Sequence, residues 1–522
     1  MSFNANPFRR GLAAVAAALL VTGATAPRAE ANLLVSLYAQ GVAESAARRD
    51  DLAAFYRGRD FEGIWTGTDE ASELRRMAFI SSLGDAAMHG LPASRFNPER
   101  AMAILAGAST ADSRGRAEVE LTAYFLSYSR ALNTGLIAPS SIDENFKREV
   151  QRLPTQVILA DFLENPRALL HSLPPASPEY QRLMRAKVRL SEVIANGGYG
   201  PGVQGTLNLG DSGPQVVRLR DRLIAMDLLE PTLTATFDGT ILAAVRRFQE
   251  SVALEPDGVV GGATVTMLNM SAEDRLESVL VAMERERWLN NLERGDRHIW
   301  VNLTDFSAQI RDFDSVTFET KAVIGAGQFD KQTYEFSDTM EYMELNPYWY
   351  VPRSIINRDY GGRVPSGFQA IDSQGRIVQT SSAQNVSVRQ PPGPNNALGT
   401  VKFMFPNPHA IYLHDTPARS LFSRVVRAYS SGCIRLNEPH EFAYALLERQ
   451  VEDPEAYFQG ILRTRQNSRI TLDEPVPVHL VYRTAFTSPD GQLHFRNDVY
   501  NRDARIWAEL ERLGVAITAP TG

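Results

Sequence analysis

Hydrophobic residues recur at helical spacing over the first part of the chain. In AEVELTAYFLSYSRALNTGLI, for example, Leu121, Phe125 and Tyr128 fall on one face of a helix. Short segments rich in proline and glycine, such as HGLPASRFNPER and HSLPPASPEY, separate one helix from the next. The pattern predicts an all-α scaffold domain over residues 32–200, in which the aromatic residues pack the core.

A compact unit with two amphipathic stripes follows. The first stripe begins at Val216 and the second at Ile241, and glycine turns punctuate both. The segments LGDSGPQVVRLRDRL, FDGTILAAVRRFQ and DGVVGGAT resemble the peptidoglycan-binding module of cell-wall enzymes. We therefore expect a small three-helix module over residues 206–270, roughly 65 residues long and near the lower size for independent folding. A generic helical linker domain is the alternative.

We expect a further helix over residues 271–295 that links to the scaffold. After it, hydrophobic and polar residues alternate along the chain. The stretch HIWVNLTDFSAQIRDFDSVTFETKAVIG contains runs with a two-residue period and is rich in β-branched residues. This predicts a β-rich domain over residues 296–485. Residues 354–398 interrupt it with a segment too polar for a core, as in RQPPGPNNALG, and such insertions are often lids. Residues 486–522 are expected to form an extension packed on the β-rich or the scaffold domain.

Length and composition predict several domains, and together with the helical and β-rich segments they give a multidomain α+β fold class. A chain of 522 residues with 44% hydrophobic residues can bury several cores. Its formal net charge is -7 and it has no lysine- or arginine-rich block, which argues against nucleic acid as a partner.

The N-terminus has the layout of a secretory signal peptide, residues 1–31. Arg9 and Arg10 precede the apolar run GLAAVAAALLV, and small residues follow up to Ala31. The apolar run is about half of the ~20 residues that a membrane-spanning helix requires. We expect cleavage near Asn32 and export, with an uncut signal that tethers the protein as the alternative.

The single cysteine, Cys433, lies in IYLHDTPARSLFSRVVRAYSSGCIRLNEP and cannot form an internal disulfide bond. Most lone cysteines are small buried hydrophobic residues. Two features favour a nucleophile instead: Gly432 allows close approach of the backbone to a substrate, and a helix expected after an Asn437 N-cap would bring its positive end near the sulfur. Lowering the thiol pKa by about two units requires roughly 2.7 kcal/mol, more than a helix end supplies, so we expect a histidine partner.

His414 is the strongest candidate among the eight histidines for that partner. It ends the strand-like run AIYLH and precedes the turn DTP, and strand ends commonly display catalytic side chains. His409 follows a proline turn and His440 lies at a helix start, where surface or capping roles suffice. No carboxylate or thiol set completes a zinc site around His409 and His414, so we assign no metal and no cofactor.

HDTP followed by SSGCIRL resembles the L,D-transpeptidases, whose YkuD-like domain carries a histidine upstream of a Gly-Cys-aliphatic-Arg motif. The resemblance extends through NPYWYVPRSI, the lid segment and TAFTSPDGQLHFRNDVYNRD. With FYRGRDFEGIW, LGDAAMHGLP and the wall-binding module, the chain is similar to the large, lid-bearing periplasmic L,D-transpeptidases of Gram-negative bacteria. Many members of the wider family have histidine where this chain has Ser431, and no role of that histidine is carried over.

This resemblance implies acyl transfer on a peptidoglycan stem peptide. Cys433 would attack the carbonyl between the third residue of a tetrapeptide, usually meso-diaminopimelate, and its terminal D-Ala. A diaminopimelate amine of a second stem would then capture the thioester and form a 3→3 crosslink. His414 would carry the proton, and the backbone N–H groups of Gly432 and Cys433 would stabilise the oxyanion.

Five further residues are expected to bind substrate. Arg435 could pair with a substrate carboxylate or form a structural ion pair. Ser431 adjoins the motif. Tyr412, Tyr429 and Trp349 could wall the donor groove or pack the domain.

The resemblance also implies partners and a location. Peptidoglycan stem peptides and glycan are the expected partners, together with proteins of cell-wall synthesis, carbapenems are expected inhibitors, and the periplasm is the expected compartment. Two alternatives stay open. One is a cysteine hydrolase of wall peptides that uses His479 or His494, and the other is a noncatalytic wall-binding protein in which Cys433 is a relic.

Overall fold

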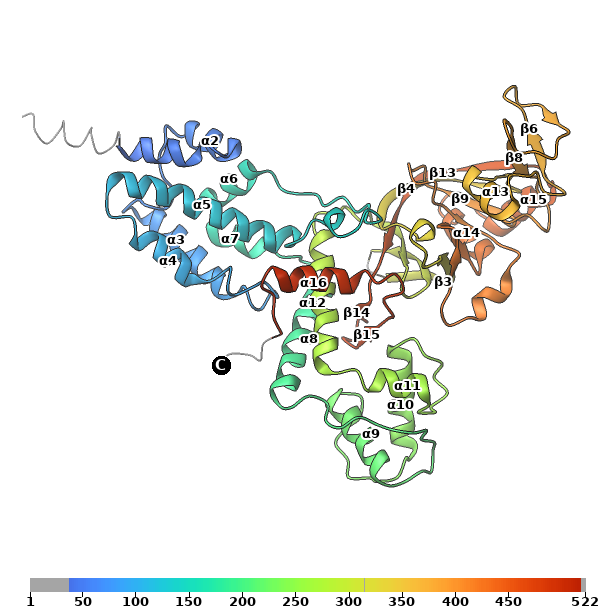
Figure 1. The fold of residues 1–522 in the computed structure, drawn as a ribbon, viewed down its shortest axis with the longest axis horizontal. Helices are drawn as coiled ribbons and strands as arrows, with labels where there is room; N and C mark the ends of the chain where they lie inside the picture. Colours follow the sequence, from blue (N-terminus) through green and yellow to red (C-terminus); the bar gives the residue numbers. More distant parts are fainter. Residues whose placement is uncertain (1–36, 314, 518–522) are drawn as a thin grey trace, which may run out of the picture. The chain divides into compact units, whose positions relative to one another are not determined.

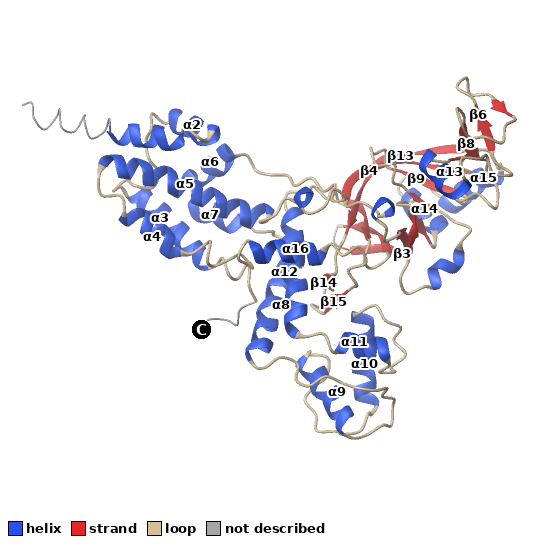
Figure 2. Ribbon diagram, in the orientation of Figure 1, coloured by secondary structure: helices blue, strands red, loops and turns tan. Residues whose placement is uncertain are grey.

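The computed structural model describes residues 37–313 and 315–517, and these form a multidomain α+β protein, as expected (Figure 1). Helices make up the N-terminal part, and the large sheet lies in the C-terminal half (Figure 2). The expected signal peptide, residues 1–31, lies outside the described residues. None of the helices in the described part is long and apolar enough to cross a membrane.

The N-terminal helices divide between two compact units. Of the described residues, 37–76 and 99–124 belong to one unit, and residues 77–98 cluster with residues 125–313 and 315–517. The predicted scaffold segment is helical, its helices fall in both units, and its extent as one domain stays a prediction. Its helices are α2 (Asp50–Arg57), α3 (Glu70–Gly84), α4 (Pro98–Ala106), α5 (Ala111–Thr134), α6 (Thr155–Glu164), α7 (Pro166–Ser172) and α8 (Pro178–Ala195), with the 3-10 turn η1 (Pro139–Ser141).

A buried carboxylate organises the first unit. Glu118 of α5 is fully buried, and its Oε1 accepts from the backbone N–H of Ile64 at 2.6 Å, while its Oε2 accepts from that of Thr66 at 3.0 Å. Because a buried carboxylate is costly without donors, these bonds stabilise both the carboxylate and the loop after α2.

The helix α12 (Ala272–Trp288) joins several parts of the second unit through buried charges. It packs against α8, and its Arg285 pairs with Glu335 of the β-rich domain at 2.7 Å and with Asp503 of α16 (Asp503–Arg512) at 2.9 Å. Arg287 and Glu284 of the same helix form a second buried pair at 2.7 Å. Removing one member of such a pair typically costs about 3–5 kcal/mol, because it leaves an uncompensated buried charge.

The wall-binding segment folds as three short helices, α9 (Pro214–Ala225), α10 (Gly239–Ser251) and α11 (Gly262–Leu268). Asp238 caps α10 by accepting from the N–H groups of Thr240 at 2.9 Å and Ile241 at 3.1 Å. The two predicted stripes are fully buried and meet in one core, formed by Val216, Leu219, Leu223, Ile241, Val245 and Phe248.

The β-rich domain is a nine-stranded sheet in the order β11-β3-β12-β10-β9-β4-β13-β1-β2, which the pairing of β2 with β3 closes on itself. Apolar side chains from alternate positions fill its interior. The strands are β1 (Arg297–Asn302), β2 (Ser307–Asp312), β3 (Ser315–Gly325), β4 (Phe336–Leu345), β9 (Val401–Met404), β10 (Leu413–His414), β11 (Ala428–Ser430), β12 (Ile434–Leu436) and β13 (Ser468–Val481), and the helices and 3-10 turns are η2 (Phe329–Lys331), η3 (Arg419–Ser423), α14 (Pro439–Leu447) and α15 (Pro454–Arg463).

The expected lid is a small subdomain rather than a polar loop. A helix and four short strands in the order β5-β8-β6-β7 surround a cluster of Val351, Ile356, Ala383 and Val388. The segment contributes no residue to the apolar cluster inside the nine-stranded sheet, in line with its polar composition, but its few apolar residues form this small cluster of their own. The elements are β5 (Trp349–Tyr350), α13 (Arg353–Tyr360), β6 (Gln369–Ile371), β7 (Ile377–Val378) and β8 (Ser387–Gln390).

The C-terminal extension contacts both neighbouring parts. Its hairpin of β14 (Ala485–Thr487) and β15 (Leu493–Phe495) packs on α8 and α12, and the Tyr500 hydroxyl donates to the carbonyl oxygen of Gly325 in β3 at 2.6 Å. The extension thus ties the β-rich domain to the helices.

Candidate active site

The parallel pairing of β10 with β12 sets which side chains share a face. Leu413 lies opposite Ile434 and His414 lies opposite Arg435. Leu413 and Ile434 are fully buried in the interior of the sheet. Because side chains alternate along a strand, His414 and Arg435 project from the outer face.

Tyr412 and Cys433 immediately precede these two strands, two positions before His414 and Arg435, and therefore share the outer face. The N–H of Ile434 donates to the carbonyl oxygen of Tyr412 at 3.0 Å, which continues the ladder. The Tyr412 and His414 rings lie with centroids 5.6 Å apart. His414 and Cys433 are therefore diagonal neighbours on one face of the sheet, a relationship that lets side chains interact.

The Cys433 thiol is half-buried, and its Sγ lies 3.6 Å from the carbonyl oxygen of Ala410. Burial raises the pKa of Cys433 above its ordinary value, although hydrogen bonds from Tyr412 and the charges of Lys402 and Arg435 act in the opposite direction. The expectation of a lowered thiol pKa is wrong in the resting site, because the loss of hydration outweighs these contributions.

His414 is held in one orientation and one tautomer. Its Nδ1 lies 2.5 Å from the carbonyl oxygen of Asp415. A carbonyl oxygen only accepts, so Nδ1 carries the hydrogen and Nε2 keeps a free lone pair. Burial and the nearby charge of Arg435 lower the pKa of His414 to about 3, so the ring is neutral near pH 7. Its Nε2 is a potential proton acceptor.

Asp415 anchors the turn that follows His414. Its Oδ2 accepts from the N–H and the hydroxyl of Thr400 at 2.8 and 2.7 Å, and its Oδ1 accepts from the N–H of Thr416 at 2.6 Å and from Arg419 at 2.5 Å. Gly399 lies against this carboxylate with φ of +61°, and a Cβ there would fall 2.3 Å from Asp415. The hydrogen bonds of Asp415 therefore fix the turn of the HDTP motif and with it the position of His414.

The guanidinium of Arg435 has no ion-pair partner within the described ranges 37–313 and 315–517, and its Nε is buried without a hydrogen-bond acceptor. Burial lowers the pKa of Arg435. The structural ion pair considered from the sequence is thus not present in this structure. A cation left unpaired beside the thiol is suited to an anionic group of a ligand.

Sequence reasoning missed Lys402 and Glu344 on this outer face. Lys402 of β9 lies opposite His414, with its Nζ 4.2 Å from the Tyr412 ring and 4.0 Å from Glu344 of β4. The alternation in TVKFMF was the signal that could have placed Lys402 beside the histidine.

A hydrogen-bonded loop holds Cys433. Gly432 has φ of +119°, and its N–H donates to Ser430 Oγ at 3.1 Å. Ser430 Oγ in turn donates to the carbonyl oxygen of Cys433 at 2.5 Å, and Thr333 Oγ1 donates to that of Gly432 at 2.8 Å. Within the described residues the Cys433 N–H has no acceptor. Of the two expected oxyanion donors, Cys433 is available here, whereas Gly432 is engaged.

The expected helix cap differs by one residue. The helix α14 begins at Pro439 with Glu438 as its N-cap residue, and no side chain caps it. Asn437 is therefore not the N-cap; its N–H still donates to the carbonyl oxygen of Lys321 in β3 at 2.9 Å, which continues the pairing of β12.

The expected lid contacts the SSGC segment through Arg358 of α13. Its Nη2 donates to Ser431 Oγ at 3.0 Å, and the guanidinium also pairs with Asp359 at 2.8 Å and Asp330 at 3.8 Å. Trp349 instead packs within the lid, where its ring contacts Phe368.

Of the expected groove residues, Tyr412 touches the thiol and Ser431 is exposed beside it, while Tyr429 on β11 is 49% exposed. Trp349 lies in the lid cluster, so it is not brought to the thiol with the others.

The two alternative histidines have partners elsewhere. His479 of β13 bonds Ser337 Oγ through Nδ1 at 2.8 Å and the carbonyl oxygen of Arg294 through Nε2 at 3.0 Å, and β9 and β4 separate its strand from β10. His494 lies in the C-terminal hairpin and bonds Ser488 at 3.1 Å. In the part of the chain that the structure describes, no three histidine, cysteine, aspartate or glutamate side chains cluster as a metal site.

Comparison with protein families gives three matches. Residues 296–462 match the L,D-transpeptidase catalytic domain (YkuD), residues 212–268 match a putative peptidoglycan binding domain, and residues 50–186 match a scaffold domain.

A putative L,D-transpeptidase of Haemophilus influenzae is 29% identical over 224 residues, which cover 40% of this chain and 45% of the relative. The match thus spans less than half of that relative. Similar solved structures include L,D-transpeptidases from Xylanimonas cellulosilytica (16% identity, 54% of this chain and 100% of that chain, TM-score 0.15) and Stackebrandtia nassauensis (13% identity, 54% and 97%, TM-score 0.20). TM-scores this low support no conclusion about this chain.

Proposed function

Since the chain carries a catalytic domain of the L,D-transpeptidase family, we propose that it forms 3→3 crosslinks in peptidoglycan by cysteine acyl transfer. One observation supports this most directly: the register of β10 and β12 gathers His414, Cys433 and an unpaired Arg435 on one outer face. A proton acceptor, a nucleophile and an anion-binding group are the parts that this reaction needs.

In the first half-reaction, Cys433 Sγ attacks the carbonyl carbon between the third residue of a stem tetrapeptide and its terminal D-Ala. Both groups are neutral at rest, so His414 Nε2 takes the thiol proton as the S–C bond forms. The C–N bond then breaks, the amine of D-Ala leaves with the proton that the imidazolium returns, and a thioester remains.

The Cys433 N–H would stabilise the oxyanion of the tetrahedral intermediate. One such donor typically contributes about 3 kcal/mol in the transition state. The Gly432 N–H would contribute only after releasing Ser430 Oγ, to which it donates in this structure.

Arg435 would bind a carboxylate of the donor stem. Its planar guanidinium matches a carboxylate, and binding would supply the partner that its buried Nε lacks. Tyr412, Tyr429 and Ser431 would line the approach to the thiol, and Trp349 would contribute through the lid in which it packs.

In the second half-reaction, an amine of a diaminopimelate residue attacks the thioester carbon. His414 accepts the amine proton, the C–S bond breaks, and the proton returns to the Cys433 sulfur. Water competes with the amine, and a lid held against Ser431 by Arg358 would limit its access. Export to the periplasm through residues 1–31, and attachment to the wall through residues 206–270, belong to the same proposal.

Mass analysis of products from purified stem tetrapeptides tests this proposal. We expect a crosslinked dimer that lacks one D-Ala, no product with Cys433→Ala, and unchanged product with the control His494→Gln. Tripeptide without dimer would identify a hydrolase, and loss of activity in His494→Gln would favour the alternative base. No turnover by folded protein would favour a noncatalytic wall-binding protein.

A further inference from the structure

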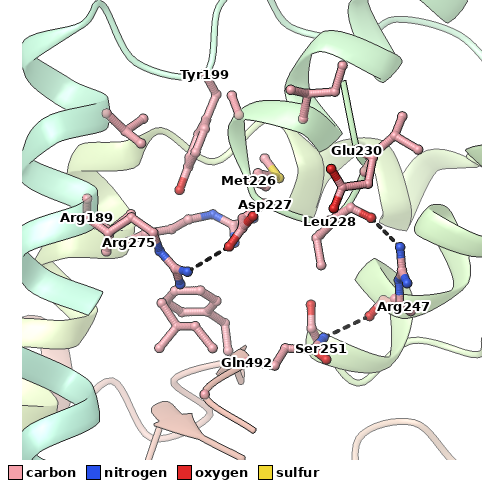
Figure 3. Close-up of a pocket in the computed structure, with 18 of the residues that line it drawn as sticks. Arg189, Tyr199, Met226, Asp227, Leu228, Glu230, Arg247, Ser251, Arg275 and Gln492 are labelled. Atoms are coloured by element: carbon pink, nitrogen blue, oxygen red, sulfur yellow. Dashed lines mark hydrogen bonds and ion pairs between the residues drawn. The ribbon is translucent and has the colours of Figure 1, made fainter. Parts of the chain in front are cut away.

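A cavity that includes neither Cys433 nor His414 lies where the wall-binding module meets α8, α12 and the C-terminal hairpin (Figure 3). Its volume is about 570 Å³, within the range of cavities that hold small ligands. Charged side chains from all four parts line it, together with Tyr199: Arg189 of α8, Arg247 of α10, Arg275 of α12, Glu230 of the module and Asp490 of the hairpin.

Arg275 is the most informative of these residues. It is only 5% exposed, its Nε has no hydrogen-bond acceptor, and it makes no ion pair with any residue that the structure describes. Its guanidinium stacks on Phe495 at 4.8 Å and on Tyr199 at 5.6 Å, and one nitrogen donates to the carbonyl oxygen of Met267 at 3.1 Å. A buried cation without an anion is costly, so a carboxylate bound in the cavity would offset that cost.

The wall of the cavity has groups that a ligand can displace or use. Arg189 pairs with Asp227 at 3.1 Å, but both side chains are largely exposed, so this pair contributes little stability and can exchange partners. Arg247 donates to the carbonyl oxygen of Leu228 at 2.5 Å, and Figure 3 shows these two interactions on opposite sides of the cavity. Glu230 is exposed at the rim and could accept from an amine.

We propose that this cavity binds a peptidoglycan stem peptide through a carboxylate at Arg275 and an amino group at the acidic rim. That the ligand is a stem peptide rests on the proposed function. That the ligand is a peptide with both a carboxylate and an amino group rests on the charges of the cavity itself. The module would then bind the wall together with α8, α12 and the hairpin, not by its own surface alone. A second stem held in this way would keep the enzyme on its polymer between turnovers.

Calorimetric titration of the full chain carrying Cys433→Ala and Arg435→Gln tests the cavity, since these changes remove turnover and the proposed carboxylate contact at the donor groove. We expect a soluble stem tripeptide to bind, and the same peptide with its carboxylates amidated to bind roughly 10- to 100-fold more weakly. Adding Arg275→Gln should produce a similar loss, and Glu230→Gln should weaken binding severalfold. Free D-Ala, tested alone, should bind far more weakly than the tripeptide.

Equal binding of the native and amidated peptides to the unsubstituted cavity would overturn the proposal without any question of folding. Unchanged binding in both Arg275→Gln and Glu230→Gln would also overturn it. Whether Arg275→Gln disturbs the fold is tested in a second chain that carries only this change and keeps Cys433. Normal acylation of Cys433 in that chain shows that it is folded. If the peptide binds at the cavity but the unmodified chain forms no crosslinked product, the proposed cavity site stands and the proposed catalysis is rejected. Failure of the one proposal can thus be distinguished from failure of the other.

Discussion

The Nδ1 of His414 donates its hydrogen to the carbonyl oxygen of Asp415, which leaves Nε2 as the only ring nitrogen that can accept a proton. Burial keeps this ring neutral by lowering its pKa to about 3, and burial also raises the pKa of the Cys433 thiol. The resting site is therefore a neutral pair, in which the proton moves during attack rather than before it.

The first prediction concerns pH. If the pair is neutral, the rate of Cys433 acylation should change little between about pH 5.5 and about pH 8, and should rise only as the thiol itself ionises at higher pH. Stopped-flow measurement of carbapenem acylation at constant ionic strength gives the profile. A sigmoidal rise centred near the ordinary histidine pKa, about 6.5, would instead indicate a preformed thiolate–imidazolium pair.

The second prediction concerns the contact of Gly399 with Asp415, which holds the turn after His414. Gly399→Ala places a Cβ 2.3 Å from Asp415 at a positive φ, so it should destabilise the protein by about 1–3 kcal/mol and slow acylation. Gly375→Ala in the lid is the matched control, because its φ is also positive but no atom lies within 4 Å of the added Cβ. Denaturant unfolding and acylation rates check both variants. Equal effects on acylation would show that Asp415 does not position the site.

The third prediction concerns the lid. Arg358→Ala removes the bond to Ser431, so more of the thioester should be lost to water and the ratio of hydrolysed to crosslinked product should rise. Product masses at a fixed acceptor concentration give that ratio. Arg376→Ala, which removes a lid ion pair with Asp372 that does not involve Ser431, should leave the ratio unchanged. An unchanged ratio in Arg358→Ala would mean that this contact does not control water.

The fourth prediction concerns acid stability. The pKa values of His414 and His479 are lowered by burial to about 3, so between about pH 3 and about pH 6.5 the unfolded chain binds more protons than the folded one. The stability that these neutral rings contribute is present above pH 6.5 and is lost as the pH falls. At pH 5 the loss should be about 2 kcal/mol for each ring.

Thermal unfolding at the two pH values provides the check for this prediction. His414→Gln should show a smaller drop between neutral pH and about pH 5 than the parent chain, because glutamine does not titrate. An equal drop in the variant and the parent would contradict a buried neutral His414.

Alternation and helical spacing predicted which parts of the chain are helical and which are β-rich. Cys433 and His414 were singled out differently, by a lone cysteine after Gly432, a histidine at the end of the strand-like run AIYLH, and the resemblance of HDTP and SSGCIRL to a known family. Long-range contacts could not be predicted in this way. Thr333 bonds Gly432 across 99 residues, and nothing in the local pattern around either residue indicates that bond.

The burial of charged side chains is the other feature that the sequence pattern did not predict. Arg285 and Arg287 of α12 lie in a charged run that is typical of an exposed helix face, yet both are buried because their partners come from the same helix and from distant segments. The expectation of a lowered thiol pKa failed for a related reason. It counted a helix end and a histidine near Cys433 but not the hydration that the fold removes.

The central claim is that Cys433 is the nucleophile and His414 its base, and intact-mass analysis during incubation with a carbapenem tests it most directly. We predict one adduct on Cys433 in the unmodified chain, none in Cys433→Ala, and acylation about 100-fold slower in His414→Gln, with His479→Gln as the matched control at the parent rate. Absence of an adduct on folded protein, or an unchanged rate in His414→Gln, would contradict these roles of Cys433 and His414.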